Sequence, residues 1–167
     1  HGKAVALKYL GHIDESKKIL EQIITNSDSS IQSAITLGML YLSDRQFERG
    51  MKLYTLRSKE SKFKEIFFDK IWSKEICLRN KDILVYSDCG FGDTIMYSRF
   101  LPILNKEVKS ITLQTDKELL SILNESLHGI NIIKKGVTPP QYDIVMSIMD
   151  IQYALNMDFS QVKNTQP

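Results

Sequence analysis

The residues with the most chemical potential form one short run, Gly90-Phe91-Gly92-Asp93-Thr94. An apolar, β-branched segment precedes this run, and an amphipathic segment follows it. This pattern predicts a strand, a tight loop and the first turn of a helix. Glycine lacks a Cβ and admits close approach, and the first turn of a helix leaves N–H groups unpaired and carries positive partial charge. We therefore expect binding chemistry at residues 88–94, which we call the glycine loop.

Two common nucleotide-binding motifs fit the glycine loop poorly. A dinucleotide fingerprint needs a third glycine, and the chain has Ile95 at that position. Asp116, at the end of the next predicted strand, is placed to bind a ribose, but Asp93 would put a carboxylate against the pyrophosphate. A P-loop is excluded because the loop contains no Gly-Lys-Ser/Thr.

The composition is that of an ordinary globular protein, with 43% hydrophobic and 25% charged residues. A net charge of +2 is too small to favour nucleic acid as a partner. No apolar run approaches the roughly 20 residues that span a bilayer, and no signal peptide opens the chain. Cys77 and Cys89 are too few for a disulfide framework and lack metal-ligand spacing. We expect a cytoplasmic protein without a membrane span, a metal or a cofactor.

Residues 3–80 have helical periodicity throughout, with no alternation typical of strands. Gly11 separates two short helices, and two more are predicted over residues 31–42 and 46–57. A shift of 34 residues places small residues on small ones and bulky residues on bulky ones. The aligned pairs are Ala4 with Gly38, Ser16 with Gly50, Leu7 with Tyr41, Ile13 with Phe47 and Leu20 with Tyr54.

This pattern resembles the tetratricopeptide repeat, which has the same period. The second copy is the closer one; the first is degenerate, and Lys62 stands where the family usually has proline. A generic pair of helical hairpins is the alternative. The resemblance implies a protein or peptide partner bound through the helical repeats. Residues 63–80 are predicted to form a capping helix whose Phe67, Ile71 and Trp72 pack against the following domain.

From residue 82 the pattern changes to alternating strands and helices. Strands are predicted over residues 83–87, 110–115, 130–134 and 143–148, with helices over 94–106 and 117–124. Pro102 should kink or open the first of these helices. The alternation indicates a parallel sheet with right-handed crossovers and strand order 3-2-1-4, as in half of a doubly wound fold.

The predicted fold class is therefore α plus α/β. We expect a tetratricopeptide-like stack with its capping helix over residues 3–80, a Rossmann-like half-domain over residues 81–160 and a polar tail over residues 161–167.

The α/β region also resembles a known group of bacterial proteins. They join tetratricopeptide repeats to a glycosyltransferase-like module with two Rossmann-type domains, and the Gly-x-Gly-Asp turn is similar to that of heptosyltransferases. The likeness extends over nearly the whole chain and is most specific over residues 83–104. Its motifs are residues 83–87, 90–94 and 98–104, Trp72, Pro139-Pro140-Gln141-Tyr142-Asp143 and Ser147-Ile148-Met149.

The resemblance implies roles for several residues of the glycine loop. Gly90, Phe91 and Gly92 would line a cleft for the acceptor, and Asp93 would be the base for an acceptor hydroxyl. Asp93 could instead cap the following helix by accepting from N–H groups near Ile95 and Met96. Thr94 would cap the helix or bind a ligand oxygen. Asp88 and Cys89 border the same cleft without a role, and with no histidine nearby in sequence Cys89 is a packing residue rather than a nucleophile.

These observations predict the acceptor-side part of a glycosyltransferase that uses a nucleotide-sugar and modifies a glycan, a lipid-linked sugar or a protein. In such proteins a second Rossmann-type domain holds most of the donor, so we expect this chain alone to be inactive. The alternative is a protein-interaction module in which the repeats bind a partner and the α/β unit is a catalytically silent support.

Overall fold

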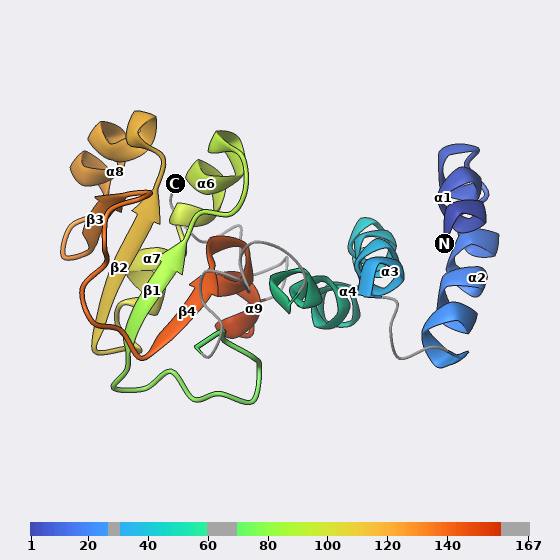
Figure 1. Cartoon of the computed structure of the whole chain (residues 1–167), viewed down its shortest axis with the longest axis horizontal. Coiled ribbons are helices and arrows are strands. Elements are labelled where there is room, and N and C mark those ends of the chain that lie inside the picture. The colour runs from blue at the N-terminus through green and yellow to red at the C-terminus, as the bar shows by residue number, and fades with distance from the viewer. Residues whose placement is uncertain (27–30, 60–69, 158–167) are drawn as a thin grey trace. The chain divides into compact units, whose positions relative to one another are not determined.

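The computed structural model describes residues 1–26, 31–59 and 70–157 (Figure 1). The chain forms two compact units, His1–Lys64 and Glu65–Pro167. The described part of the first unit is helical, and the second unit contains a parallel sheet with helices. The predicted α plus α/β fold is confirmed. The predicted tail over residues 161–167 lies outside the described residues.

The first unit consists of two helical hairpins. Its helices are α1 (Gly2–Tyr9), α2 (Ile13–Asn26), α3 (Ile31–Ser43) and α4 (Phe47–Tyr54), and a 3-10 helix (Thr55–Lys59) follows α4. All four helices contribute buried residues, from Ala4 alone in α1 to most of α3. The common core is formed by Ala4, Leu20, Leu37, Leu40 and Tyr41, with Ile13, Ile19, Ile24 and Leu53 packed against it.

Small residues allow the two helices of each hairpin to approach closely. In the first hairpin Ala4 and Ser16 are completely buried, and Ser16 Oγ donates a hydrogen bond to the Ala4 carbonyl at 2.7 Å. In the second, a Cβ added to Gly38 would lie only 2.9 Å from the Gly50 carbonyl oxygen, closer than side chains are found. The two small pairs that the sequence aligned therefore occupy matching points of helix contact.

The turns of the two hairpins are also copies of each other. Gly11 has a φ of 84° in the first turn, and Arg45, at the matching position, has a φ of 62°. This left-handed conformation is easy for glycine and uncommon for a residue with a Cβ. The matching backbone hydrogen bonds run from His12 N to Leu7 O and from Gln46 N to Tyr41 O, both at 2.9 Å. The repeat seen in the sequence is thus a repeat of backbone structure.

The second unit is built on a four-stranded sheet. Its strands are β1 (Asp82–Tyr86), β2 (Ser110–Thr115), β3 (Asn131–Lys134) and β4 (Ile144–Ser147). All pairings are parallel and the order is β3-β2-β1-β4, as predicted (Figure 1). Val85, at the centre of the sheet, lies opposite Leu113 on one side and Met146 on the other, and all three are buried.

Short helices follow β1, β2 and β4. They are α6 (Phe91–Ser98), α7 (Leu101–Leu104), a 3-10 helix (Lys117–Leu119), α8 (Leu120–Ser126), a 3-10 helix (Ile148–Asp150) and α9 (Ile151–Ala154). The single helix expected over residues 94–106 is divided into α6 and α7, and Pro102 lies in the first turn of α7. This confirms the expected effect of Pro102, because proline has no N–H to continue a helix but is tolerated at a helix start.

The predicted capping helix over residues 63–80 is wrong in its described part, because residues 70–80 are not helical. Ile71 forms a parallel bridge with Val145 of β4. Trp72 N donates to Val145 O at 2.8 Å, and Val145 N donates to Lys70 O at 2.7 Å. The open edge of β4 supplies unpaired backbone groups, and pairing with them outweighs the helical periodicity.

Ile71 and Trp72 therefore pack within the α/β unit, where Trp72 meets Tyr153 edge to face at 6.3 Å between ring centroids. The division between the units falls after Lys64, earlier than the predicted boundary after residue 80. Phe67, the third residue expected in that contact, lies outside the described residues.

Candidate functional site

The glycine loop lies at the carboxyl end of β1, between the strand and α6. From β1 the chain continues to β2 on one side, while β4 pairs with the other side of β1. This is the point at which the strand order of the sheet reverses direction. In open α/β sheets, ligands bind in the crevice outside the carboxyl ends of the strands at such a switch point. The topology therefore places the predicted loop where this fold class binds ligands.

Gly90, rather than Asp93, occupies the cap position of α6. Its backbone is extended, with φ −68° and ψ 168°, and no side chain caps the helix. The helix begins at Phe91, earlier than predicted, so Asp93 lies inside the first turn. The interpretation of Asp93 as the helix cap is therefore wrong. Glycine is tolerated at the cap position, so the helix can begin directly after Gly90 rather than at residue 94.

Asp93 lies on an exposed part of the first turn of α6. Within the described parts of the chain, its carboxylate accepts no hydrogen bond. A Cβ built on Gly90 would lie 3.9 Å from Asp93 Oδ2, so this carboxylate is near the open side of Gly90. A Cβ on Gly92 would meet nothing within 4 Å, and Phe91 is 49% exposed. The structure thus brings Gly90, Phe91, Gly92 and Asp93 together on an accessible surface.

Thr94 differs from these four residues in being completely buried. Its Oγ1 donates to the Gly90 carbonyl at 3.0 Å and lies 2.7 Å from Ser87 Oγ. The Thr94 amide also donates to the Gly90 carbonyl, at 3.0 Å. Thr94 therefore makes internal hydrogen bonds, and its side chain is not on the exposed surface expected for a residue that contacts a ligand.

Asp88 has a specific partner on the neighbouring strand. Ser147 Oγ, at the end of β4, donates a hydrogen bond to Asp88 Oδ1, and the Met149 amide donates to Ser147 Oγ at 3.1 Å. This arrangement ties the start of the glycine loop to β4. The sequence offers only a weak local signal for it, a serine that caps the helical turn after a strand.

Cys89 is half-buried and lies 3.5 Å from Thr94 Oγ1. Burial raises the pKa of the Cys89 thiol, and the negative charges of Asp88 and Asp93 raise the pKa further. The hydrogen bond with Thr94 and the charge of Lys135 act in the opposite direction but do not outweigh burial. A thiol with a raised pKa is a poor nucleophile, in keeping with the expected packing role.

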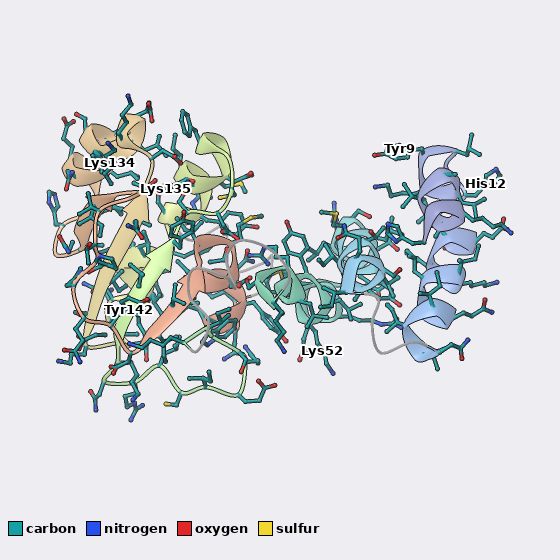
Figure 2. All side chains as sticks on the ribbon, viewed as in Figure 1. Tyr9, His12, Lys52, Lys134, Lys135 and Tyr142 are labelled. Carbon is teal, nitrogen blue, oxygen red and sulfur yellow. The ribbon has the colours of Figure 1, made fainter. Side chains whose placement is uncertain are left out.

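Asp116 is bound to a lysine of the same unit. Its Oδ2 lies 2.7 Å from Lys135 Nζ, which lies 5.5 Å from the centroid of the Tyr86 ring. Figure 2 shows Lys135 at the end of the sheet where β1 and β2 terminate. An acid that binds a ribose hydroxyl in a dinucleotide site needs a carboxylate available for that hydroxyl. The ion pair adds to the sequence arguments against a dinucleotide site.

A cavity of about 500 Å³ in the same unit shares no lining residue with the glycine loop; Trp72, Ile103 and Met157 are among the residues that line it. In the described ranges, no group of three or more His, Cys, Asp or Glu residues could hold a metal ion. None of the described helices combines the length and the apolar character needed to cross a membrane. Comparisons of the chain with protein-family models, with curated proteins and with solved structures found no match.

Proposed function

We propose that the α/β unit is the acceptor side of a glycosyltransferase-like protein and that Asp93 is its general base. The observation that carries this proposal is the accessible carboxylate of Asp93 beside Gly90 and Gly92 at the switch point of the sheet. The carboxylate accepts the proton of an acceptor hydroxyl as that oxygen bonds to the anomeric carbon of the donor sugar. The bond from this carbon to the nucleotide breaks, and the nucleoside diphosphate leaves with the bonding electrons.

The charges near the loop support the acceptor side rather than a phosphate site. The first turn of a helix favours an anion, and Asp93 already supplies one there. Asp88 adds a second carboxylate near Cys89 at the same loop. A pyrophosphate on this turn would meet two like charges. We accordingly place the nucleotide-sugar on a second Rossmann-type domain, with a glycan, a lipid-linked sugar or a protein as acceptor.

A second candidate function belongs to the helical unit, which we propose to be a tetratricopeptide-like module that binds a protein or peptide. The recurrence of the same turn and the same close helix contact in both hairpins supports it. In repeat proteins, stacked copies of one unit build extended binding surfaces. Under this alternative the α/β unit is a silent support.

The test measures sugar transfer by the full-length gene product with a panel of nucleotide-sugars. The measured signal is the nucleoside diphosphate that the reaction releases. We expect Asp93→Asn to lower kcat by about 10²–10⁴-fold, the usual contribution of a general base. Asp14→Asn is the matched control, because Asp14 is also an exposed aspartate in the first turn of a helix. Full activity in Asp93→Asn would remove the base. Capture of a defined peptide by residues 1–64, with no transfer by the gene product, would favour the second function.

A further inference from the structure

Two buried hydroxyl groups join the end of β1 to the first turn of α6. Ser87 and Thr94 are both completely buried, and their oxygens are 2.7 Å apart. Thr94 Oγ1 donates to the Gly90 carbonyl, and a threonine hydroxyl has only one proton to donate. Ser87 is therefore the donor to Thr94. These two hydrogen bonds run from Ser87 to Thr94 and from Thr94 to Gly90, and so connect both ends of the glycine loop to its middle.

The first residue of the same loop is held independently. The bond from Ser147 to Asp88 attaches that residue to β4. Of the two ties, only the one through Thr94 reaches Gly90, the residue that caps α6. The Thr94 hydroxyl therefore links the residue that caps α6 to the end of β1, and Asp93 is carried on the first turn of that helix.

We propose that Thr94 is the positioning residue of this site: its hydroxyl holds Gly90 and thereby sets where Asp93 is presented. The proposal rests on the proposed function only for the assignment of Asp93 as the reacting group. Thr94 lies beneath the loop and acts through Gly90 rather than on the acceptor.

Threonine meets two requirements at this position. Its hydroxyl accepts from Ser87 and donates to Gly90, and its methyl group fills buried space. Valine would keep the shape but leave the Ser87 hydroxyl and one hydrogen bond of the Gly90 carbonyl without a partner. A buried polar group left unpaired favours states in which the loop opens to water. Serine would keep both hydrogen bonds.

Cys89 provides a direct readout of the loop, because it is half-buried and next to Thr94. Cys77 is the other cysteine of the chain and is exposed. In a Cys77→Ser background, an aromatic disulfide reagent therefore reports on Cys89 alone. Fitting the rate against pH to the fraction of thiolate, below the pH at which the fold loses stability, gives a limiting rate that reflects access to Cys89 rather than its pKa.

The experiment compares Thr94→Val, Thr94→Ser and Thr36→Val in that background. Thr36 is the matched control because it is also buried and donates to a carbonyl four residues earlier, that of Gln32 at 2.9 Å. We expect Thr94→Val to raise the limiting rate of Cys89 modification and the amide exchange of residues 88–93 by about tenfold. Thr94→Ser should restore both to within about twofold, and Thr36→Val should change neither.

Wild-type rates in Thr94→Val, or an equal increase in Thr36→Val, would overturn the positioning role. If Thr94→Val does not fold, Thr94→Ala removes the same hydroxyl, and with it the bond to Gly90, and is measured in the same way. The transfer assay separates this proposal from the proposed function. An open loop in Thr94→Val together with full transfer by Asp93→Asn would keep the positioning role and refute the base.

Discussion

The Tyr41 hydroxyl donates a hydrogen bond to the Glu21 carboxylate and so joins α3 to α2. Arg49 of α4 lies over the Tyr41 ring, 4.1 Å from its centroid, and its Nη2 is 3.3 Å from the same carboxylate. Three helices from two hairpins therefore meet at one phenol. Since the Tyr41 ring is 3% exposed, this polar contact is attached directly to the core.

We expect Tyr41→Phe to lower the free energy of unfolding by about 1–2 kcal/mol, because it removes a hydrogen bond to a charged group at the edge of the core. Tyr9→Phe is the control, since Tyr9 is 80% exposed. Urea unfolding of the two variants beside the wild type measures the difference. Equal stability of all three proteins would show that water replaces the Glu21 contact without cost.

The same pair predicts a loss of stability at high pH. Burial, with the hydrogen bond and charge of Glu21, raises the pKa of Tyr41 from 10.0 to about 12, although Arg49 acts in the opposite direction. Below about pH 10 the phenol is protonated in both states, and its contribution is complete. Between about pH 10 and 12 only the unfolded chain loses this proton, so the free energy of unfolding falls. This fall should be smaller in Tyr41→Phe than in Tyr9→Phe over that range.

Gly38→Ala should destabilise the helical unit by about 1–3 kcal/mol, the usual cost of overpacking. The new Cβ would meet the Gly50 carbonyl oxygen and the Tyr54 amide nitrogen, each at 2.9 Å, and backbone atoms cannot move aside cheaply. Gly2→Ala is the control because a Cβ there meets nothing within 4 Å. Thermal unfolding followed by circular dichroism distinguishes them; an unchanged Tm in Gly38→Ala would argue against the close contact of α3 and α4.

Gly92→Ala should separate stability from function. Gly92 lies inside α6, and a Cβ there meets nothing, so alanine should stabilise the helix by about 0.5–1 kcal/mol. If an acceptor approaches the backbone at Gly92, the same methyl group should raise its KM in the transfer assay. A gain in Tm with an unchanged KM would show that no ligand contacts this residue.

Trp72→Ala should cost about 3–5 kcal/mol, as for other large buried side chains. The Trp72 ring is 6% exposed and packs against Tyr153, whereas Ile76 nearby is 38% exposed. Ile76→Ala is therefore the control and should change stability little. Chemical denaturation followed by near-ultraviolet circular dichroism measures both. A small effect of Trp72→Ala would mean that the edge formed by residues 70–72 contributes little to the fold.

The sequence predicts the fold correctly where the structure depends on a local pattern of residues. The order of the sheet follows from alternating strands and helices, and the pairs of Ala4 with Ser16 and Gly38 with Gly50 follow from one repeat period. The prediction fails where contacts with residues distant in the sequence determine the local structure. Ile71 has neighbours at helical spacing, yet the edge of β4 takes it into the sheet.

The site shows the same limit. The exposed cluster at Gly90, Gly92 and Asp93 was predicted from one motif. The bond between Asp88 and Ser147 joins residues far apart in the chain, and the local signal at Ser147 does not identify Asp88 as its partner. The burial of Thr94 depends on the face that α6 turns toward Ser87, which a loop motif does not determine.

The left-handed turns at Gly11 and Arg45 allow the cost of one strained residue to be compared within the same chain. The two turns share their backbone path and hydrogen bonds, but at the left-handed position only the second has a side chain. A residue with a Cβ typically loses about 1–2 kcal/mol in this conformation. Replacing Arg45 with glycine would therefore raise the free energy of unfolding of the second hairpin. The first hairpin already has glycine at this position, so the two copies share a backbone shape but only the second can be stabilised in this way.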